Sequence, residues 1–434
     1  MNQSTGSEVK RDKWYSLYDK VYAPANLALA WEQVAENRGA AGVDGVTIAK
    51  FKVNSTERLQ ALSCDLRAKT YRPAPVRRVY IPKADGGKRP LGIPTVRDRI
   101  VQQALLQILS PIFEPEFKKS SHGFRPGLGC HSALKVVDQA VRHGYEWVVD
   151  VDIKGFFDNV DHELLLAAVN VKVSDGSVLR LIRQILQAGV IEPDTWALEP
   201  TEVGTPQGGP LSPLLANIYL HRLDEALEGR YGLVRYADDL VVFTRGEAEA
   251  NAALGLVRSV LEGELKLCLH PEKTRVSAVD AGFEFLGFQW ARAKNGRMYK
   301  RVRRKSRQRF RDRVRELTPR IKNQRKPKKR SFRVSHLSRN PRVTEMIVKL
   351  NKYLNGWHWY FKGVWQPPET AFESFDSFVR RRLRLAITGR VRGWMNMQIP
   401  NSVFQELGLI SLKERHEKYQ AVKWMYSPAP ARKG

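Results

Sequence analysis

The chain has 434 residues, more than one hydrophobic core usually supports, so we expect at least two domains. Its apolar content of 42% is that of a globular protein and excludes a disordered chain. Lys and Arg total 73 against 45 Asp and Glu, and the resulting net charge of +28 predicts a polyanionic partner, with nucleic acid the first candidate and an anionic membrane surface the second.

The sequence offers no signal for membrane insertion or secretion. It has no run of ~18 apolar residues that could span a bilayer, and its first twenty residues lack the apolar segment of a secretory signal. Cys64, Cys130 and Cys268 lie far apart and form no C-x-x-C pair, which argues against a structural zinc module or a disulfide framework. We therefore expect a cytoplasmic protein with no membrane partner.

The first two thirds of the chain predict a mixture of helices and strands. Residues 1–25 form a polar lead-in, and Leu27, Trp31 and Val34 then mark a helix followed by a Gly-rich loop. Residues 72–109 predict a strand, a tight turn, a second strand and a helix. Further along we expect a buried strand over Trp147–Val151, a Gly/Pro loop feeding a helix from residue 206, a hairpin over 233–244 and one strand over 283–290.

The composition changes after residue 296. Residues 297–333 hold nineteen Lys and Arg against two acidic residues, Asp312 and Glu316. Apolar residues recur there at helical spacing (Phe310, Val314, Leu317, Ile321) and again further on (Val343, Ile347, Leu350, Leu354, Trp357), and a basic helix follows near Phe378. The last third therefore predicts amphipathic helices with basic outer faces.

These cations would repel one another without a counter-ligand, so a nucleic-acid groove is favoured over a solvated charged face. We expect binding that weakens steeply with salt. The residues that we expect to contact nucleic acid are Arg301, Arg303, Arg304, Lys305, Arg307, Arg311, Arg380 and Arg381.

Two adjacent aspartates, Asp238 and Asp239, lie between apolar runs in LVRYADDLVVFT. Asp is common in turns, so a plain hairpin turn is one interpretation. Adjacent carboxylates repel each other, however, and a divalent cation removes that repulsion. Asp152, at the end of the strand Trp147–Val151, is the expected third carboxylate of a two-metal phosphoryl-transfer site; Asp158 and Asp161 are alternatives. Asp150 is expected to point to the opposite face of the strand and to take no part.

Six motifs in order resemble a known family: IPKADGGKRPLGIPTVRDRIVQQ (81–103), SHGFRPGLG (121–129), VDIKGFFDNVDH (151–162), GTPQGGPLSPLLANIYL (204–220), YADD (236–239) and FLGF (285–288). The chain resembles bacterial group II intron-encoded reverse transcriptases/maturases from about Asn26 onward. Many relatives carry an H-N-H endonuclease domain with a Cys-rich zinc site after the DNA-binding segment. No such cysteines occur before Gly434, so second-strand cleavage is not expected.

The resemblance implies an α+β fold, a right-hand polymerase with fingers and a palm built on an antiparallel sheet. An α-helical thumb/maturase domain and a small helical C-terminal DNA-binding domain follow. The expected boundaries are an N-terminal extension and the start of the fingers (1–70), fingers (71–145), palm (146–292), thumb/maturase (293–368) and DNA-binding domain (369–434).

The resemblance also assigns the active site. Asp152, the backbone carbonyl of Ile153 and Asp238 would hold two Mg²⁺ ions, and Asp239 would complete the catalytic set. The residues that would bind the deoxynucleoside triphosphate are Lys83 and Arg89 at its phosphates, Gln207 near its sugar, Phe157 beneath the sugar and Lys273 beside the pyrophosphate. A bulky Phe157 would exclude a ribose 2′-OH; a core aromatic and a surface lysine are the alternative interpretations of Phe157 and Lys273.

The implied function is RNA-directed DNA synthesis, with intron RNA binding, splicing assistance and retromobility. The partners would be an RNA template with a DNA primer, group II intron RNA, a DNA target and dNTPs; a homodimer is one option. Two alternatives stay open: an RNA-binding maturase whose polymerase is idle, and a defence or repair reverse transcriptase without an intron.

Overall fold

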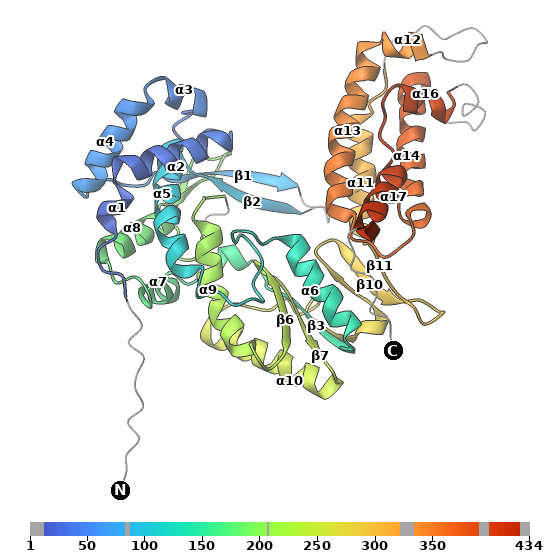
Figure 1. Ribbon diagram of the computed structural model, residues 1–434. Helices are drawn as coiled ribbons and strands as arrows, with labels where there is room; N and C mark the ends of the chain where they lie inside the picture. Colours follow the sequence, from blue (N-terminus) through green and yellow to red (C-terminus); the bar gives the residue numbers. More distant parts are fainter. Residues whose placement is uncertain (1–12, 83–86, 206–207, 322–333, 390–398, 426–434) are drawn as a thin grey trace. The chain divides into compact units, whose positions relative to one another are not determined.

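The computed structural model describes residues 13–82, 87–205, 208–321, 334–389 and 399–425 (Figure 1). The chain divides into two compact units, residues 1–278 (unit 1) and residues 279–434 (unit 2). Unit 1 is mixed α/β, and unit 2 combines a small antiparallel sheet with a helical bundle. This agrees with the predicted order of a mixed α/β part followed by helices.

The first two helices of unit 1 pack against α5, which Thr95 caps by accepting a hydrogen bond from the Asp98 amide at 3.1 Å. The helices of unit 1 are α1 (Tyr18–Val21), α2 (Pro24–Glu36), α3 (Ile48–Val53), α4 (Ser55–Arg67), α5 (Val96–Phe113), α6 (Cys130–Arg142), α7 (His162–Asn170), α8 (Gly176–Leu186), α9 (Ser212–Leu227) and α10 (Glu247–Arg258), with a short 3₁₀ turn at Phe156–Asp158 and a π-helical turn at Ser259–Glu264.

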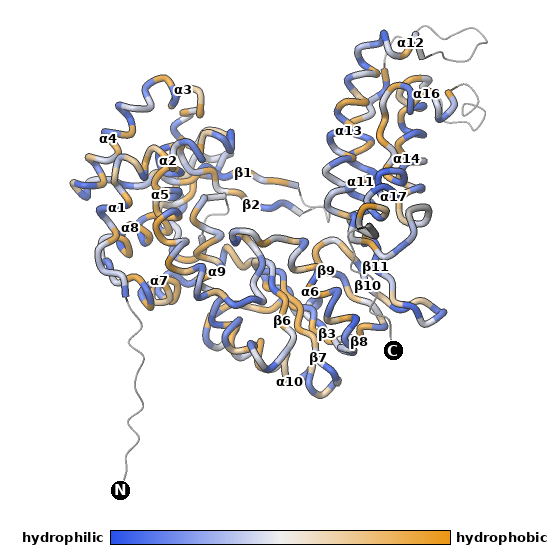
Figure 2. The backbone as a smooth tube through the Cα atoms, in the orientation of Figure 1, coloured by the Kyte–Doolittle hydropathy of each residue, from blue (hydrophilic) through white to orange (hydrophobic). Residues whose placement is uncertain are grey.

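The central sheet of unit 1 has the strand order β6-β7-β3-β8, and every neighbouring pair is antiparallel. Its strands are β6 (Gly232–Tyr236), β7 (Asp239–Thr244), β3 (Trp147–Asp152) and β8 (Arg275–Ala278). Figure 2 shows the central strands as largely apolar, and β7 is buried from its second residue to its last. Burial on both faces fixes the strand register, because a shift by one residue would turn every side chain over.

A second sheet of unit 1 has the order β2-β1-β4-β5. The hairpin β1 (Val76–Pro82) and β2 (Lys88–Ile93) is antiparallel, and the two-residue strand β4 (Val190–Ile191) joins β1 in parallel before pairing with β5 (Leu198–Glu199). One continuous core extends from α2 and α5 through α7, α8 and α9 to the inner residues of β3 and β7. The apolar side chains of both the helical part and the central sheet therefore pack as one body.

Unit 2 opens with a 3₁₀ turn at Val279–Ala281 and the sheet β9 (Phe283–Phe285), β10 (Phe288–Arg292) and β11 (Met298–Val302). The helices α11 (Arg304–Leu317), α12 (Val334–Ser338), α13 (Pro341–Phe361), α14 (Pro368–Thr388), α16 (Asn401–Glu406) and α17 (Leu412–Met425) follow. Phe310 lies at the bundle centre, with its ring centroid 4.7 Å from that of Trp357 and 4.8 Å from that of Phe375. The apolar spacing predicted for α13 is confirmed, since Val343, Ile347, Leu350, Leu354 and Trp357 are all buried.

Two sequence-based expectations for unit 2 are wrong. The segment 283–290 is a hairpin of two strands, because Leu286 and Gly287 both take positive φ angles, +44° and +86°, as a tight two-residue turn requires. Helix α11 ends at Leu317 and so excludes Ile321, since Pro319 restricts the residue before it and cannot donate a helical hydrogen bond.

The division into two units bears on only part of the predicted domain boundaries. Their division falls at residues 278 and 279, inside the predicted palm, and it does not separate fingers from palm or thumb from DNA-binding domain. Those finer boundaries stay predictions. No helix among the described residues is both long and apolar enough to cross a bilayer, and all three cysteines are free thiols.

Candidate active site

Three carboxylates come together at one end of the central sheet. Asp152 is the last residue of β3 and Asp239 the first of β7, and the two are directly paired across the antiparallel ladder. Asp238 occupies the turn before β7, where β6 ends at Tyr236 opposite Asp239. Residues from distant parts of the sequence thus meet because an antiparallel sheet aligns the end of one strand with the start of the next.

The charge on Asp238 is unfavourable in this setting. Burial raises the pKa of its carboxyl above the usual value, and the negative charge of Asp152 raises the pKa further, whereas Arg89 and Arg235 act in the opposite direction. Desolvation and a neighbouring like charge both disfavour the ionised form. A carboxylate in such a position gains from a bound cation, which would relieve both effects.

The backbone beside Asp152 is held by the loop that precedes β8. The Asp152 carbonyl accepts a hydrogen bond from the His270 amide at 2.8 Å, and Lys154 donates to the Cys268 carbonyl at 2.9 Å. Ile153 faces Leu269 in an isolated antiparallel bridge whose two hydrogen bonds use these neighbouring backbone groups. The bridge fixes the strand end that carries both Asp152 and the Ile153 carbonyl.

Lys273 comes from the same loop and reaches the site. Its ammonium Nζ lies 3.4 Å from Oδ1 of Asp152, and its side chain is 58% exposed. From the sequence, Lys273 was either a surface lysine or an active-site lysine. Its position has both features. Lys273 is accessible to solvent and is also the cation beside the first predicted metal ligand.

The alternative carboxylates have other surroundings. Asp161 caps α7 by accepting from the Leu164 amide, and its Oδ2 lies 2.6 Å from Lys266, which with the cap lowers the pKa of this carboxyl. Asp158 is exposed in the 3₁₀ turn after Phe156. The expectation that Asp150 points to the opposite face is wrong, because Asp150 lies two residues before Asp152 in β3 and side chains two apart share a face. Arg275 is within 3.9 Å of its Oδ2.

The predicted nucleotide-binding residues are described in part. Arg89 lies on the exposed end of β2 opposite Ile81, and its charge acts on Asp238. Lys83 and Gln207 lie outside the described residues. Phe157 is half-buried, with its ring edge against Phe156 at a centroid distance of 5.1 Å. One side of this ring is thus packed on the core, while the residue keeps an exposed portion.

The loop before Gln207 docks on the backbone of Phe157. The Thr205 amide donates to the Phe157 carbonyl at 2.7 Å, and a Cβ built on Gly204 (φ +92°) would lie 2.9 Å from the same oxygen. His162 supports this loop through a 2.6 Å contact between its Nε2 and the Gly204 carbonyl. Only glycine permits this backbone approach, so the loop is held against Phe157.

The sequence reasoning missed a buried polar group beside the acidic turn. Arg235, within LVRYADD, is fully buried and forms an ion pair with the fully buried Asp224 of α9. A charged residue inside an otherwise apolar strand was the available signal, because such a residue is rarely buried without a partner.

A divalent cation at this site would have few protein ligands. Among the described residues, no group of three or more His, Cys, Asp or Glu side chains is placed to hold a metal ion. Mg²⁺ commonly takes only one or two protein carboxylates and completes its shell with water and substrate phosphates. Asp152, Asp238 and a backbone carbonyl therefore fit Mg²⁺ better than they fit a metal that requires a complete protein cage.

The predicted nucleic-acid residues lie in unit 2, on β11, α11 and α14 and, for Arg303, at the N-cap of α11. Arg304, Lys305 and Arg311 are exposed on α11, whereas Arg307 is half-buried, and burial together with Arg301, Arg311 and Arg304 lowers its pKa. Arg301 donates to Oε1 of Gln289 at 2.9 Å, and Arg303 lies 3.9 Å from Glu284. The predicted nucleic-acid residues thus fall into two groups: Arg304, Lys305 and Arg311 face solvent, whereas Arg301 and Arg303 interact with side chains of the same unit.

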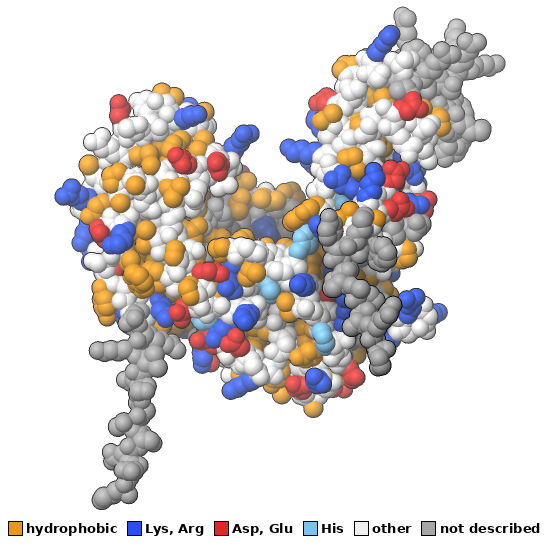
Figure 3. Space-filling view, viewed as in Figure 1, with side chains coloured by type: hydrophobic (Ala, Val, Ile, Leu, Met, Phe, Trp, Pro, Cys, Tyr) orange, Lys and Arg blue, Asp and Glu red, His pale blue; other side chains and the backbone are white. Residues whose placement is uncertain are grey.

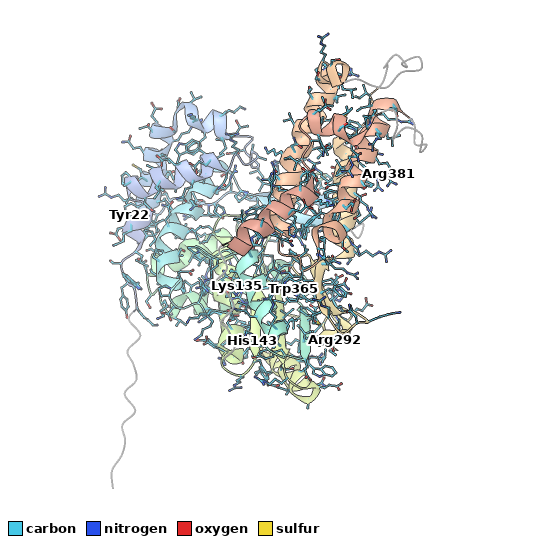
Figure 4. All side chains as sticks on the ribbon, turned by 45° about the vertical axis from the view of Figure 1, so that its right-hand side comes forward. Tyr22, Lys135, His143, Arg292, Trp365 and Arg381 are labelled. Atoms are coloured by element: carbon cyan, nitrogen blue, oxygen red, sulfur yellow. The ribbon has the colours of Figure 1, made fainter. Side chains whose placement is uncertain are left out.

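Three of these residues line one groove. Arg311, Arg380 and Arg381 border a depression of about 610 Å³ together with Arg384 and Phe378. The guanidinium groups of Arg311, Arg315 and Arg381 all lie within 6 Å of the Phe378 ring centre, at 5.9, 5.7 and 5.4 Å. Figure 3 shows Lys and Arg side chains on the helical unit, and Figure 4 shows Arg381 on the outer side of its bundle.

Comparison with known proteins identifies two segments. Residues 81–290 match the family model "Reverse transcriptase (RNA-dependent DNA polymerase)", and residues 333–398 match "Group II intron, maturase-specific domain". The first segment contains all three carboxylates of the site and the strands that carry them. The chain thus combines a reverse transcriptase region with a maturase-specific region.

Curated relatives agree with these matches. Protein YkfC of Escherichia coli (strain K12) is 36% identical over 313 residues, which are 63% of this chain and 82% of YkfC. The group II intron-encoded protein LtrA of Lactococcus lactis subsp. cremoris is 44% identical over 212 residues, 48% of this chain and 34% of LtrA. The putative COX1/OXI3 intron 2 protein of Saccharomyces cerevisiae is 32% identical over 207 residues, 47% of this chain and 24% of that protein.

The chain therefore spans about a third of LtrA but most of YkfC. Together, the matched regions and relatives define the class as reverse transcriptase with a maturase segment. The chain belongs to the bacterial group II intron-encoded reverse transcriptase/maturase family, as its motifs predicted.

Proposed function

We propose that this chain is an RNA-directed DNA polymerase that adds deoxynucleotides to a primer 3′-OH on an RNA template. We also propose that it binds group II intron RNA, assists its splicing and takes part in retromobility at a DNA target. The observation that carries the polymerase proposal is the cross-strand pair Asp152–Asp239, with Asp238 in the adjoining turn, inside the reverse transcriptase region.

The carboxylates of Asp152 and Asp238 and the carbonyl of Ile153 would hold two Mg²⁺ ions, with Asp239 completing the acidic cluster. When bound, these ions would activate the primer hydroxyl and neutralise the charge of the transferred and departing phosphates. The raised pKa of Asp238 supports this role, because a cation would offset the repulsion from Asp152. Lys273, 3.4 Å from Asp152, would compete with a cation for that carboxylate or turn its Nζ proton towards pyrophosphate.

The nucleotide would lie beside the Gly/Pro loop that precedes α9 and the β1–β2 hairpin. Arg89 is exposed and acts electrostatically on Asp238, so its guanidinium is available to a triphosphate bound near the carboxylates. Lys83 and Gln207 keep their proposed roles at the phosphates and the sugar. Phe157 would exclude a 2′-OH, since its ring is packed on Phe156 and its backbone is held by Thr205.

Unit 2 would bind the phosphates of nucleic acid. The groove bordered by Arg311, Arg380 and Arg381 presents guanidinium groups around an aromatic ring, and guanidinium is well suited to phosphate oxygens. Each phosphate contact releases counterions, so affinity would fall steeply with salt. Substituting Arg381 by Gln should weaken RNA binding and lower the slope of log K against log salt by roughly one unit; an unchanged slope would remove this residue from the interface.

The polymerase proposal is tested by primer extension on an RNA template with dNTPs and Mg²⁺. The wild-type chain should extend the primer, and Asp238→Asn should reduce the rate by several orders of magnitude. Asp150→Asn is the matched control, since Asp150 lies on the same strand and face but beside Arg275. No extension by the wild type rejects the polymerase; equal extension by Asp238→Asn rejects the site.

The alternatives predict other outcomes. A maturase with an idle polymerase would bind intron RNA and assist splicing while the wild type fails to extend a primer. A defence or repair reverse transcriptase would extend primers but show no preference for an intron RNA over a control RNA of equal length. The maturase-specific match at residues 333–398 supports the intron-linked proposal over the second of these.

A further inference from the structure

The turn that carries Asp238 has a disfavoured backbone. Ala237 takes φ +56°, in the left-handed region. Residues other than glycine and asparagine rarely adopt this conformation, because the Cβ clashes with the backbone. Strained backbone of this kind persists only where the surrounding structure enforces it. The enforcing contacts can be named, because Ala237 is buried and its neighbours are described.

Arg235 supplies the first contact. Its Nη1 donates to the Ala237 carbonyl at 3.1 Å, and so binds the strained residue directly. The other donors of the same guanidinium reach the Asp224 carboxylate (2.7 Å from Nε), the Asn217 side-chain oxygen (3.0 Å) and the Ser121 hydroxyl (2.8 Å). With the second bond to Asp224, all five N–H groups of Arg235 are used.

The partners of Arg235 tie two further segments to the turn. Asn217 and Asp224 lie seven residues apart on α9 and therefore on one face of it. The Asn217 amide also donates to the Gly123 carbonyl at 2.8 Å. Gly123 lies against the turn so closely that a Cβ built on it would come within 2.5 Å of the Ala237 amide nitrogen.

The backbone of the 120–123 segment completes the arrangement. Arg235 donates its amide to the Ser120 carbonyl at 2.8 Å and accepts from the His122 amide at 2.9 Å. The turn is thus enclosed by α9 on one side and the 120–123 segment on another, with the guanidinium at their junction. We call Arg235, Asp224, Asn217 and Ser121 the turn clamp.

Stability alone does not account for a clamp of this chemistry. A buried ion pair is on average no more stabilising than well-packed apolar side chains of the same volume, because both charges lose their hydration. What directional hydrogen bonds add is a fixed geometry. Here that geometry belongs to the carbonyl of the residue directly before Asp238.

We propose that Arg235, Asp224 and Asn217 are positioning residues that fix the Ala237 backbone and thereby orient the Asp238 carboxylate for divalent-cation binding. This rests on the proposed function, which makes Asp238 a cation ligand. The clamp meets the turn at the Ala237 carbonyl, and the Arg235 guanidinium also acts electrostatically on Asp238. Helix α9 begins directly after the Gly/Pro loop, so the same helix joins that loop to the turn.

The test is Mn²⁺ binding to the full-length chain, measured from the electron paramagnetic resonance signal of free Mn²⁺ without nucleic acid or nucleotide. The variants are Asn217→Ala, Ser121→Ala and Arg235→Lys, with Asp238→Asn as the loss-of-site reference. Asp175→Asn is the matched control, because Asp175 is also a buried carboxylate and accepts from the amides of Leu17, Tyr18, Ser177 and Val178 at the start of α8. Thermal unfolding is recorded for every variant.

We expect Asn217→Ala and Arg235→Lys to weaken the Mn²⁺ affinity about 10–100-fold, as substitutions behind a metal ligand commonly do. Ser121→Ala should weaken it less, and Asp175→Asn should lower the melting temperature with unchanged affinity. Wild-type affinity in Asn217→Ala and Ser121→Ala overturns the clamp, even if Arg235→Lys fails to fold. An equal loss in Asp175→Asn also overturns it.

The same Mn²⁺ titration distinguishes the positioning role of the clamp from the proposed cation site at Asp238. If the wild type binds Mn²⁺ and Asp238→Asn abolishes that binding, the cation site stands and the clamp variants decide the positioning role. If Asp238→Asn binds Mn²⁺ as well as the wild type, the cation site fails and the clamp falls with it.

Discussion

Removal of the negative charge from Asp224 should be the most destabilising conservative substitution in the clamp. Asp224→Asn keeps the size of the side chain but leaves the Arg235 guanidinium, which is fully buried, without the carboxylate of its ion pair. Breaking one side of a buried ion pair in this way costs about 3–5 kcal/mol. In a unit the size of unit 1, that corresponds to a fall in Tm of roughly 6–20 °C.

The assay is thermal unfolding of the full-length chain by calorimetry, supported by urea titration at constant pH. Glu264→Gln is the matched control, because the pair Arg222–Glu264 at 2.7 Å is also in unit 1 but is 54% and 43% exposed. Exposed pairs contribute less than about 1 kcal/mol. A loss of under 1 kcal/mol in Asp224→Asn would refute the reasoning, because it would mean that Arg235 is neutralised by something other than Asp224.

A double variant extends this prediction to function. Replacing both partners, with Arg235→Met and Asp224→Leu, removes the two charges together and should recover most of the lost stability. It also removes the donor to the Ala237 carbonyl, so Mn²⁺ binding should stay weak. Recovery of both stability and Mn²⁺ affinity would show that the clamp acts only through folding.

Three further predictions concern single side chains. Phe157→Ala should lower the preference for dNTP over NTP by roughly 10–100-fold in kcat/KM, and an unchanged preference would exclude the sugar-gate role. Burial, and after it the charge of Asp152, raises the pKa of the Asp238 carboxyl, so the wild type should lose stability as pH rises from the unfolded pKa through the raised folded pKa. In metal-free urea titrations, Asp238→Asn should lack that loss. A stability difference between the wild type and this variant that does not change with pH would contradict the prediction. Burial, together with the positive charges of His416, Arg415 and Lys362, lowers the pKa of His358 to about 4, so stability should fall as pH drops below the unfolded pKa of about 6.5. His358→Gln should unfold with a flatter dependence between pH 6.5 and 4, and identical curves would exclude this histidine as the cause.

The motifs in the sequence were sufficient for the family and for the strand ends that carry the carboxylates. LVRYADDLVVFT predicts a hairpin because apolar residues flank a polar turn, and β6 and β7 have that form. The position of Asp152 at a strand end suggested that it joins the acidic pair, and the resemblance supported this, but nothing local specifies that its strand pairs with the strand of Asp239. Register between distant strands is a property of the packed sheet.

The clamp shows what the sequence could not supply. Arg235 was missed although it is a charge within an apolar strand, and its partners Asp224 and Ser121 lie 11 and 114 positions away. A helix period predicts that Asn217 and Asp224 share a face of α9, and not that this face meets the turn. The turn between β9 and β10 was missed because a Leu at positive φ gives no sequence signal of its own.

The central claim is best tested by anomalous X-ray scattering from Mn²⁺ in crystals of the chain with a primer–template and an incoming nucleotide. The account predicts two peaks ~3.5–4 Å apart, each within coordination distance of Asp152 or Asp238. One of the two peaks should also lie within coordination distance of the Ile153 carbonyl. Peaks elsewhere in unit 1, or none at this end of the β3–β7 pair while nucleotide is bound, would contradict it.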